Sequence, residues 1–192
     1  MSTILHVYKG MRKFFASLLE VLEIAVIAVV AVFVVRTYLV QPFLVSGTSM
    51  VPTFASGDYV LTDELTFHFR TPERGEVVVF HDPEDWSTYF IKRVIGLPGE
   101  HVVIKNSEVT IYNQHDPNGF TLDEKYLPSG LVTSGNIDVT LSSSSYFMLG
   151  DNRPFSYDSR SWGPLPAKNI VGLVRFRLWP VNELQAFAAP NY

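Results

Sequence analysis

Three stretches of the chain carry residues whose types suit nucleophilic catalysis by a serine with a lysine as its base. The first, SGTSMVPTF at 46–54, places Ser49 in a short segment braced by glycine, threonine and proline. The second, FIKRVIGLPG at 90–99, embeds Lys92 among apolar residues. The third, GDNRPFSYDSR at 150–160, is dense in polar groups. Because a serine hydroxyl is a weak nucleophile until a neighbouring base takes its proton, these stretches together predict Ser/Lys chemistry.

Lys92 can act as a base only if it is neutral near the working pH. Burial disfavours the ammonium form and lowers the pKa of a lysine. On a strand, Lys92 shares one face with Phe90 and Val94, and that face could bury its amine. The alternative is a lysine on an edge strand that faces water or extends its stem along the surface. Arg93 points to the opposite face, where a structural or surface role is expected.

A histidine is the usual base for a serine, and the chain has five of them. His81 is the only candidate among the five, because it adjoins Asp82 and could complete a Ser-His-Asp set. No other feature of the sequence around His81 indicates a catalytic role, so a solvated surface position is the alternative interpretation.

Composition sets limits on the class of protein. The chain has 192 residues, a formal net charge of -4 and no cysteine. A nucleic-acid footprint is not expected, because no long basic block is present. Disulfides, a thiol nucleophile and a Cys-ligated zinc are excluded. No metal cluster or nucleotide loop is visible, and the predicted chemistry needs no cofactor.

The elements that must position these residues begin with an apolar run. We expect a membrane crossing at 18–40, with Glu23 and Arg36 near opposite interfaces. More basic residues precede the run than closely follow it, which predicts a cytoplasmic N-terminus and a domain outside. The alternative is a cleavable secretory signal. The sequence at 36–41 offers no small-x-small cleavage site, which favours an uncleaved anchor.

Short strand signals dominate after residue 50, and no long helical period appears. They predict a mainly β protein, with an antiparallel sheet or partly closed barrel behind the transmembrane helix. The expected strands are 58–62, 76–80, 89–95, 101–105, 109–112, 137–141, 146–149 and 171–178. The expected organisation is a cytoplasmic segment at 1–17, the anchor at 18–40, a catalytic β domain at 41–96 and 146–192, and a small inserted β subdomain at 97–145.

Four stretches in this order resemble the successive motifs of the bacterial type I signal peptidases, also called leader peptidases. They are SGTSMVPTF at 46–54, GDYVLTDEL at 57–65, IKRVIGLPGE at 91–100 and GDNRPFSYDSRSWG at 150–163. The resemblance extends from the anchor to about residue 180 and is weakest across 101–145. It implies a membrane-anchored serine endopeptidase that removes signal peptides from secreted preproteins at small-x-small sites.

The resemblance also implies residue roles. Ser49 would attack the scissile carbonyl and Lys92 would take its proton, while Ser156 would hydrogen-bond and orient Lys92. The backbone N–H of Ser49 would help to hold the oxyanion. Some family members use a serine hydroxyl where this chain has Gly47, so backbone donors or the adjacent threonine would have to replace it. The remaining residues implied to support the site are Asp158, Arg160, Asp151, Asn152 and Arg153.

The implied substrate lies extended between segments 43–46 and 89–91 as an added strand. Shallow apolar pockets would read its small side chains, and ordinary core packing is the alternative for each lining residue. The candidate lining residues are Phe43, Leu44, Val45, Met50, Phe54, Phe90 and Ile91. The expected partners are secretory preproteins and the lipid bilayer, with the protein translocation machinery as a further candidate and no nucleic acid. The expected location is the cell membrane, with a single pass and an extracytoplasmic catalytic domain.

Three other classes of protein could carry some of these features. A self-cleaving repressor with Ser/Lys chemistry would carry a DNA-binding helical unit where this chain has an apolar run. A β-lactamase-like site would need a lysine three residues after Ser49. A silent membrane-anchored binding domain would tolerate replacement of Ser49 and Lys92.

Overall fold

The computed structural model describes residues 17–33 and 40–190. Residues 1–39 and 40–192 form two separate compact units. The first contains a helix over 17–33. Within the described ranges, no helix combines the length and the apolar character that a membrane crossing requires. The predicted span of 18–40 includes residues 34–39, which lie outside the described residues.

The second unit is built mainly from antiparallel strands, which confirms the mainly β, antiparallel part of the predicted fold class. Its larger sheet has eight strands. They are β1 (Val40–Leu44), β2 (Tyr59–Asp63), β3 (Val77–His81), β4 (Tyr89–Gly96), β9 (Ser145–Leu149), β10 (Leu165–Pro166), β11 (Ile170–Trp179) and β12 (Gln185–Ala186). The order is β1-β2-β11-β3-β4-β9-β10, and β12 pairs with β11.

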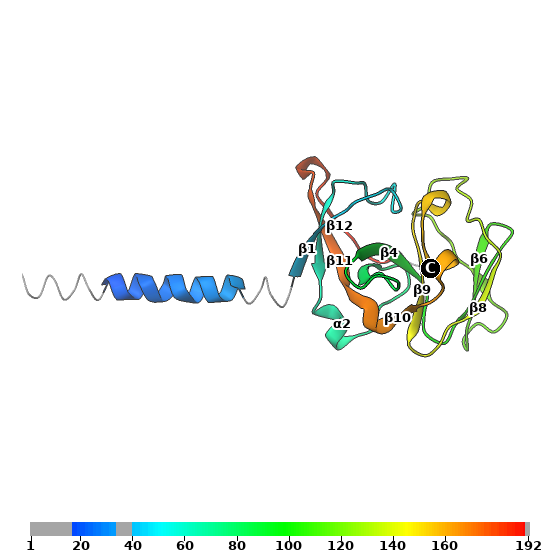
Figure 1. Ribbon diagram of the computed structural model, residues 1–192, viewed down its shortest axis with the longest axis horizontal. Helices are drawn as coiled ribbons and strands as arrows, with labels where there is room; N and C mark the ends of the chain where they lie inside the picture. Colours follow the sequence, from blue (N-terminus) through cyan, green and yellow to red (C-terminus); the bar gives the residue numbers. More distant parts are fainter. Residues whose placement is uncertain (1–16, 34–39, 191–192) are drawn as a thin grey trace, which may run out of the picture. The chain divides into compact units, whose positions relative to one another are not determined.

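A second sheet of four strands lies in the order β7-β6-β5-β8. Its strands are β5 (His101–Lys105), β6 (Glu108–Tyr112), β7 (Phe120–Thr121) and β8 (Ile137–Thr140). Asn106 and Ser107 join β5 to β6 with φ values of 52° and 70°, the conformation of a tight hairpin turn. In Figure 1, β6 and β8 lie at one end of the 40–192 unit, β1 and β12 lie at the other, and β4 runs between them.

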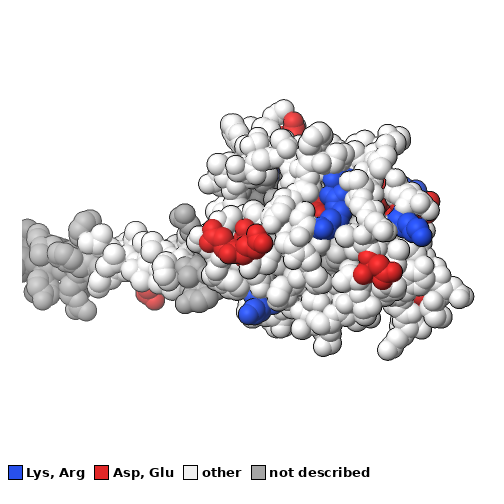
Figure 2. Space-filling model, turned by 45° about the vertical axis from the view of Figure 1, so that its right-hand side comes forward, with Lys and Arg blue, Asp and Glu red and all other residues white. Residues whose placement is uncertain are grey.

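Short helical turns complete the second unit. They are α2 (Thr66–Phe69), η1 (Arg153–Phe155), α3 (Ser159–Trp162), η2 (Ala167–Asn169) and η3 (Val181–Glu183). Figure 2 shows one face of the molecule, on which charged side chains of both signs form small separate groups. That face carries no continuous basic surface of the kind that binds nucleic acid.

Strand β4 is covered on both faces, so its side chains pack into two different layers. Ile91 lies opposite Val79 on β3, and both belong to a core cluster that includes Val45. Phe90 lies opposite Phe80, in a different cluster on the other face. Successive side chains of β4 therefore enter two different apolar layers.

Each of the eight predicted strands matches an observed strand closely in place, but β1, β7, β10 and β12 were not predicted. The sequence pattern predicts no strand before residue 58, whereas β1 pairs with β2 from Val40 to Leu44. Apolar character there looks like the end of the preceding apolar run, and Pro42 argues against an interior strand. Since β1 is the first strand in the sheet order, Pro42 is compatible with its edge position.

Candidate active site

Ser49 and Lys92 meet beside strand β4. Lys92 Nζ donates a hydrogen bond to Ser49 Oγ at 2.8 Å and a second to the carbonyl oxygen of Ile91 at 2.9 Å. The two residues are 43 positions apart in the sequence. Ser49 sits in a turn at 47–54, shortly after β1, while Lys92 is held inside the sheet. The predicted pair of nucleophile and base is thus brought within hydrogen-bond distance.

Lys92 is in the environment that the predicted chemistry needs. Its side chain is buried, with 4% of the residue exposed, and its Nζ lies 5.3 Å from the centre of the Phe90 ring. Burial lowers the pKa of Lys92 from 10.5 to about 8, and the negative charges of Asp158 and Asp151 partly oppose that shift. At this pKa about a tenth of the Lys92 amines are neutral at pH 7.

The turn that carries Ser49 is attached to the polar loop at 150–160. The backbone N–H of Asn152 donates to the carbonyl oxygen of Ser49 at 3.0 Å. The side chain of Asn152 donates to the carbonyl oxygen of Thr48 at 2.9 Å. Within the described part of the chain, the backbone N–H of Ser49 donates to no group. It is therefore available for a developing negative charge on a substrate.

Asp151 joins the nucleophile turn to β4. Its buried carboxylate accepts two hydrogen bonds from Arg93, at 2.9 and 2.5 Å, and one from the hydroxyl of Thr53 at 2.5 Å. Arg93 also donates to the carbonyl oxygen of Gly75 and lies over the ring of Tyr126. Arg93 is thus buried and ion-paired, which agrees with the structural role expected for it and excludes the surface alternative.

Asp158 fixes the loop from the other side. Its carboxylate accepts the backbone N–H of Gly150 at 3.1 Å and the guanidinium of Arg160 at 2.8 Å. Arg160 then donates to the carbonyl oxygen of Arg153 at 2.6 Å. The predicted supporting pair of Asp158 and Arg160 therefore holds both ends of the loop.

Arg153 anchors the same loop to the 120–135 region, which lies next to the small sheet in sequence. Its guanidinium is buried, and it donates to Thr133 at 2.6 Å and to Glu124 at 3.0 and 2.5 Å. It also donates to the hydroxyl of Tyr126 at 3.0 Å. Arg153 Nε donates a further hydrogen bond to the carbonyl oxygen of Gly150 at 3.0 Å.

Ser156 lies against the site but does not make the predicted bond to Lys92. Its Oγ is buried and has no hydrogen-bond partner among the described residues. A Cβ added to Gly150 would lie 2.1 Å from Ser156 Oγ and 2.4 Å from the carbonyl oxygen of Ser49. Only a glycine at 150 lets these two residues approach so closely.

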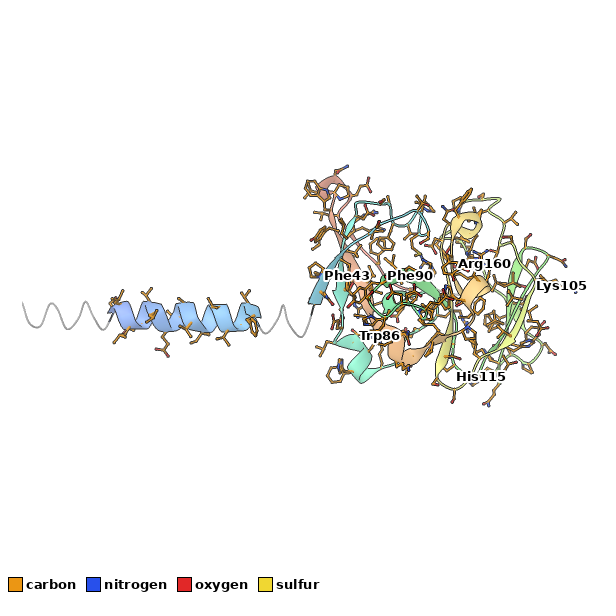
Figure 3. All side chains as sticks on the ribbon, in the orientation of Figure 1. Phe43, Trp86, Phe90, Lys105, His115 and Arg160 are labelled. Carbon is orange, nitrogen blue, oxygen red and sulfur yellow. The ribbon has the colours of Figure 1, made fainter. Side chains whose placement is uncertain are left out.

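A groove of about 320 Å³ opens between β1 and β4 beside the pair. Its walls include Phe43 and Leu44 on one side and Phe90 and Ile91 on the other. Figure 3 shows Phe43 and Phe90 in the part of the molecule that the larger sheet occupies. The rings of Phe43 and Tyr89 lie 5.1 Å apart across it. Ser49 and Lys92 both line this groove, so an extended peptide in it would pass the nucleophile.

Comparison with known protein families shows to which family the chain belongs. A model of the family described as "Signal peptidase, peptidase S26" matches residues 18–179. The chain belongs to this family of signal peptidases. The resemblance to the type I enzymes is confirmed, and the chain is a peptidase by family.

Two individual relatives agree with this assignment by sequence. "Signal peptidase I" of Leptolyngbya laminosa is 36% identical over 163 residues, which cover 81% of this chain and 77% of that protein. "Signal peptidase IB" of Staphylococcus aureus is 34% identical over 170 residues, which cover 80% and 85%. A crystal structure of a signal peptidase I from Enterococcus faecalis is 28% identical, with a TM-score of 0.45, and the match covers 54% of this chain and 97% of that one.

Five of the predicted substrate-lining residues of this signal peptidase do line the groove. They are Phe43, Leu44, Val45, Phe90 and Ile91.

Met50 and Phe54 were also predicted to line the groove, but the structure places them elsewhere. They are 1% and 0% exposed and belong to the core beneath the groove, with Val60 and Val174. The turn after Ser49 folds their side chains inward, a direction that sequence alone does not give. They support the nucleophile turn from below instead of lining the groove.

The alternative base, His81, is engaged elsewhere. Its Nδ1 is 2.7 Å from the carbonyl oxygen of Trp86, and its ring stacks on the Trp86 ring with centroids 4.2 Å apart. Lys92 is the group that contacts Ser49. Within 17–33 and 40–190, no three His, Asp or Glu side chains gather in a way that could hold a metal ion.

Several residues of the site were not predicted. Thr53 was visible only as part of the first motif, and its bond to Asp151 links residues 98 positions apart. Glu124 lies outside the four motifs that the sequence offered. Phe155 and Tyr157 line the groove, although no sequence pattern gives them a role.

Proposed function

We propose that this signal peptidase is a serine endopeptidase with a Ser49/Lys92 dyad that cuts secretory preproteins after small-x-small sites. The observation that carries the proposal is the 2.8 Å hydrogen bond between Lys92 Nζ and Ser49 Oγ, made by a buried lysine whose pKa is lowered to about 8. A neutral amine at that distance can take the hydroxyl proton, which is the step that a serine nucleophile needs.

Lys92 would carry the proton through both steps of the proposed reaction. Neutral Lys92 accepts the proton of Ser49 as Oγ forms a bond to the scissile carbonyl carbon, and the carbonyl oxygen becomes negative. The resulting ammonium gives the proton to the leaving amine as the C–N bond breaks, which leaves an acyl-enzyme on Ser49. A water molecule next loses a proton to Lys92 and attacks the ester. Lys92 returns that proton to Ser49 as the cleaved signal peptide leaves.

The oxyanion would be held by the free backbone N–H of Ser49. Such a donor contributes roughly 3–4 kcal/mol to transition-state stabilisation in comparable enzymes. Gly47 has φ of 97° and offers no side-chain donor, so Thr48 is the hydroxyl in a position to add a second one. The orienting role of Ser156 is supported by its buried hydroxyl, which has capacity for a hydrogen bond close to Ser49.

The substrate would lie in the groove as a strand beside β4. Residues 93–96 of β4 pair with β9, whereas Tyr89–Ile91 pair only with β3 among the described residues. Their free edge can therefore bind an extended peptide. Side chains that point toward Ile91 would meet Val45, Val60 and Val79, which form an apolar wall suited to small residues.

The N-terminal unit would hold the enzyme at the cell membrane in a single pass. Its helix over 17–33 exposes apolar side chains, with Leu19, Ile24 and Val29 at 64%, 68% and 68%. Such a surface needs an apolar environment. The orientation would be cytoplasmic at the N-terminus and extracytoplasmic for the catalytic unit, following the basic residues before the apolar run. The lipid bilayer would then be a partner and the translocation machinery a neighbour.

Cleavage of a secretory precursor by the full chain in detergent tests the proposal. Ser49→Ala and Lys92→Ala should each abolish cleavage after the small-x-small site. Lys105→Ala is the matched control, because Lys105 is exposed at the end of β5, in the small sheet, away from Phe90 in Figure 3.

Two results would count against the proposal. Cleavage that survives Lys92→Ala would exclude Lys92 as the base. Failure of the parent chain to cut several different precursors would favour a silent binding domain.

A further inference from the structure

Two aromatic side chains in the groove have no part in the proposed chemistry. Phe155 and Tyr157 line the groove and are 76% and 49% exposed. Ser156, which lies between them, has extended backbone with φ of -117° and ψ of 124°, and its side chain faces Gly150. Phe155 ends the turn η1 and Tyr157 follows Ser156, and the exposure of both side chains and their place in the groove lining show that they are directed into the groove.

Tyr157 is held in place from two sides. Its hydroxyl donates to Glu84 at 3.0 Å. Its ring meets the Phe90 ring edge-on, with centroids 6.5 Å apart and an angle of 87° between the planes. Glu84 belongs to the connection between β3 and β4, where its backbone N–H donates to the carboxylate of Asp82. The 150–160 loop is therefore tied across the groove to the hairpin that presents β4.

The faces of β4 separate this aromatic wall from the small apolar wall. Ile91 lies opposite Val79 on one face, and Phe90 lies opposite Phe80 on the other. A substrate strand beside Tyr89–Ile91 would alternate its side chains between the same two faces. If the small residues of the substrate point to the Ile91 face, the residue between them points to the Phe90 face.

We infer that Phe90, Phe155 and Tyr157 form a second subsite that binds a large apolar or aromatic substrate side chain, at the position between the two small residues. The inference rests on the proposed function, because it takes the cleavage register from Ser49. The occupant is a substrate side chain because Phe155 and Tyr157 line the same groove as Ser49 and Lys92. Burying an aromatic or aliphatic side chain against these rings stabilises the complex, whereas a small residue leaves them exposed.

The test is a series of precursors that differ only in the residue between the two small ones, which is Gly, Ala, Leu or Phe. kcat/KM is measured for the full chain in detergent, for Phe155→Ala and for Tyr157→Ala. The parent should prefer Phe and Leu over Ala by about three- to tenfold. Each variant should bring this preference close to one, because it lowers kcat/KM for the Phe and Leu precursors more than for the Ala precursor.

Phe69→Ala is the matched control. Phe69 is also a highly exposed aromatic residue, at 81%, but it lies on α2 outside the groove lining. This variant should keep the preference of the parent, and loss of the preference in it would overturn the inference.

Failure of the inference differs from failure of the proposed function. Cleavage that depends on Ser49 but is equal for all four precursors would overturn the subsite alone. An equal fall for all precursors in Phe155→Ala and Tyr157→Ala would also overturn it, because the two residues would then act only on the stability of the loop. Absence of Ser49-dependent cleavage would overturn the proposed function itself.

Discussion

The guanidinium of Arg93 holds the carboxylate of Asp151 with two hydrogen bonds, and both groups are almost completely buried. Arg93 directly follows Lys92 on β4, and Asp151 directly follows Gly150, which contacts the nucleophile turn. The pair therefore fixes the distance between the strand that carries the base and the loop that supports the nucleophile.

Replacement of Arg93 by Met should destabilise the catalytic unit by about 3–5 kcal/mol, because Asp151 would remain as a buried charge without its partner. Urea-induced unfolding followed by tryptophan fluorescence measures this. Lys125→Met is the control, since its ion pair with Asp123 is exposed and should change stability by less than about 0.5 kcal/mol. Equal effects of the two substitutions would contradict the role of the Arg93 pair.

Thr53→Val removes the hydroxyl that donates to Asp151 while it nearly keeps the shape of the side chain. A hydrogen bond to a charged group contributes about 1.5–3 kcal/mol, so stability should fall by that amount. The rate of precursor cleavage should fall too, because the turn at 47–54 loses its link to β4. Thr53→Ser keeps the donor and should restore both properties. An inactive Thr53→Ser would indicate that packing of the methyl group matters more than the bond.

Activity should depend on pH through Lys92. The ammonium form cannot accept a proton, so kcat/KM should rise with pH, with an inflection near a pKa of about 8 and a plateau above it. The negative charge of Asp158 raises the pKa of Lys92, so Asp158→Asn should move the inflection to lower pH. A pH–rate profile of each protein measures the shift. An inflection that moves upward, or one that does not move, would contradict this account of the charges.

Gly150→Ala should reduce kcat/KM by at least about 100-fold, because the new Cβ would collide with Ser156 and with the carbonyl oxygen of Ser49. Displacement of Ser49 by even a fraction of an ångström lengthens its contact with Lys92. Circular dichroism of the variant should show a retained β fold. Parent-like cleavage by this variant would mean that the loop can move without disturbing the dyad.

Ser156→Ala should separate stability from catalysis. Its hydroxyl is buried without a partner among the described residues, so its removal should leave stability unchanged or slightly higher. If the hydroxyl turns to Lys92 when a substrate is bound, kcat should fall by roughly 10- to 100-fold with little change in KM. Parent-like kcat would exclude the orienting role.

Much of the fold was predictable because the strands after residue 58 are short runs of alternating or continuous apolar residues that are bounded by turn residues. The predicted strand at 101–105 has the same limits as β5, and the one at 89–95 differs from β4 by one residue. Such patterns depend on neighbours in sequence. The order of the strands in the sheet depends on contacts between distant segments, which no local pattern encodes.

The site was predictable in a different way. Ser49 and Lys92 were selected by the resemblance, since an apolar surrounding alone leaves a surface lysine as an alternative. The direction of Met50 and Phe54 could not be predicted, because a turn has no period that assigns side chains to a face. The bond between Thr53 and Asp151 could not be predicted either, because it joins two segments whose approach depends on the packing of the whole sheet.

The contacts of Arg153 have a consequence for exchanging parts between relatives. Its buried cation is neutralised by Glu124 and bound by Thr133, and both lie in the 97–145 stretch, outside the four sequence motifs. Consider a chimera that receives 97–145 from another signal peptidase. If the new segment lacks an acid and a hydroxyl at these positions, the positive charge of Arg153 would be buried without a partner beside the catalytic loop. A donor segment for such an exchange therefore needs an acid and a hydroxyl that reach back to Arg153, whatever its length and surface.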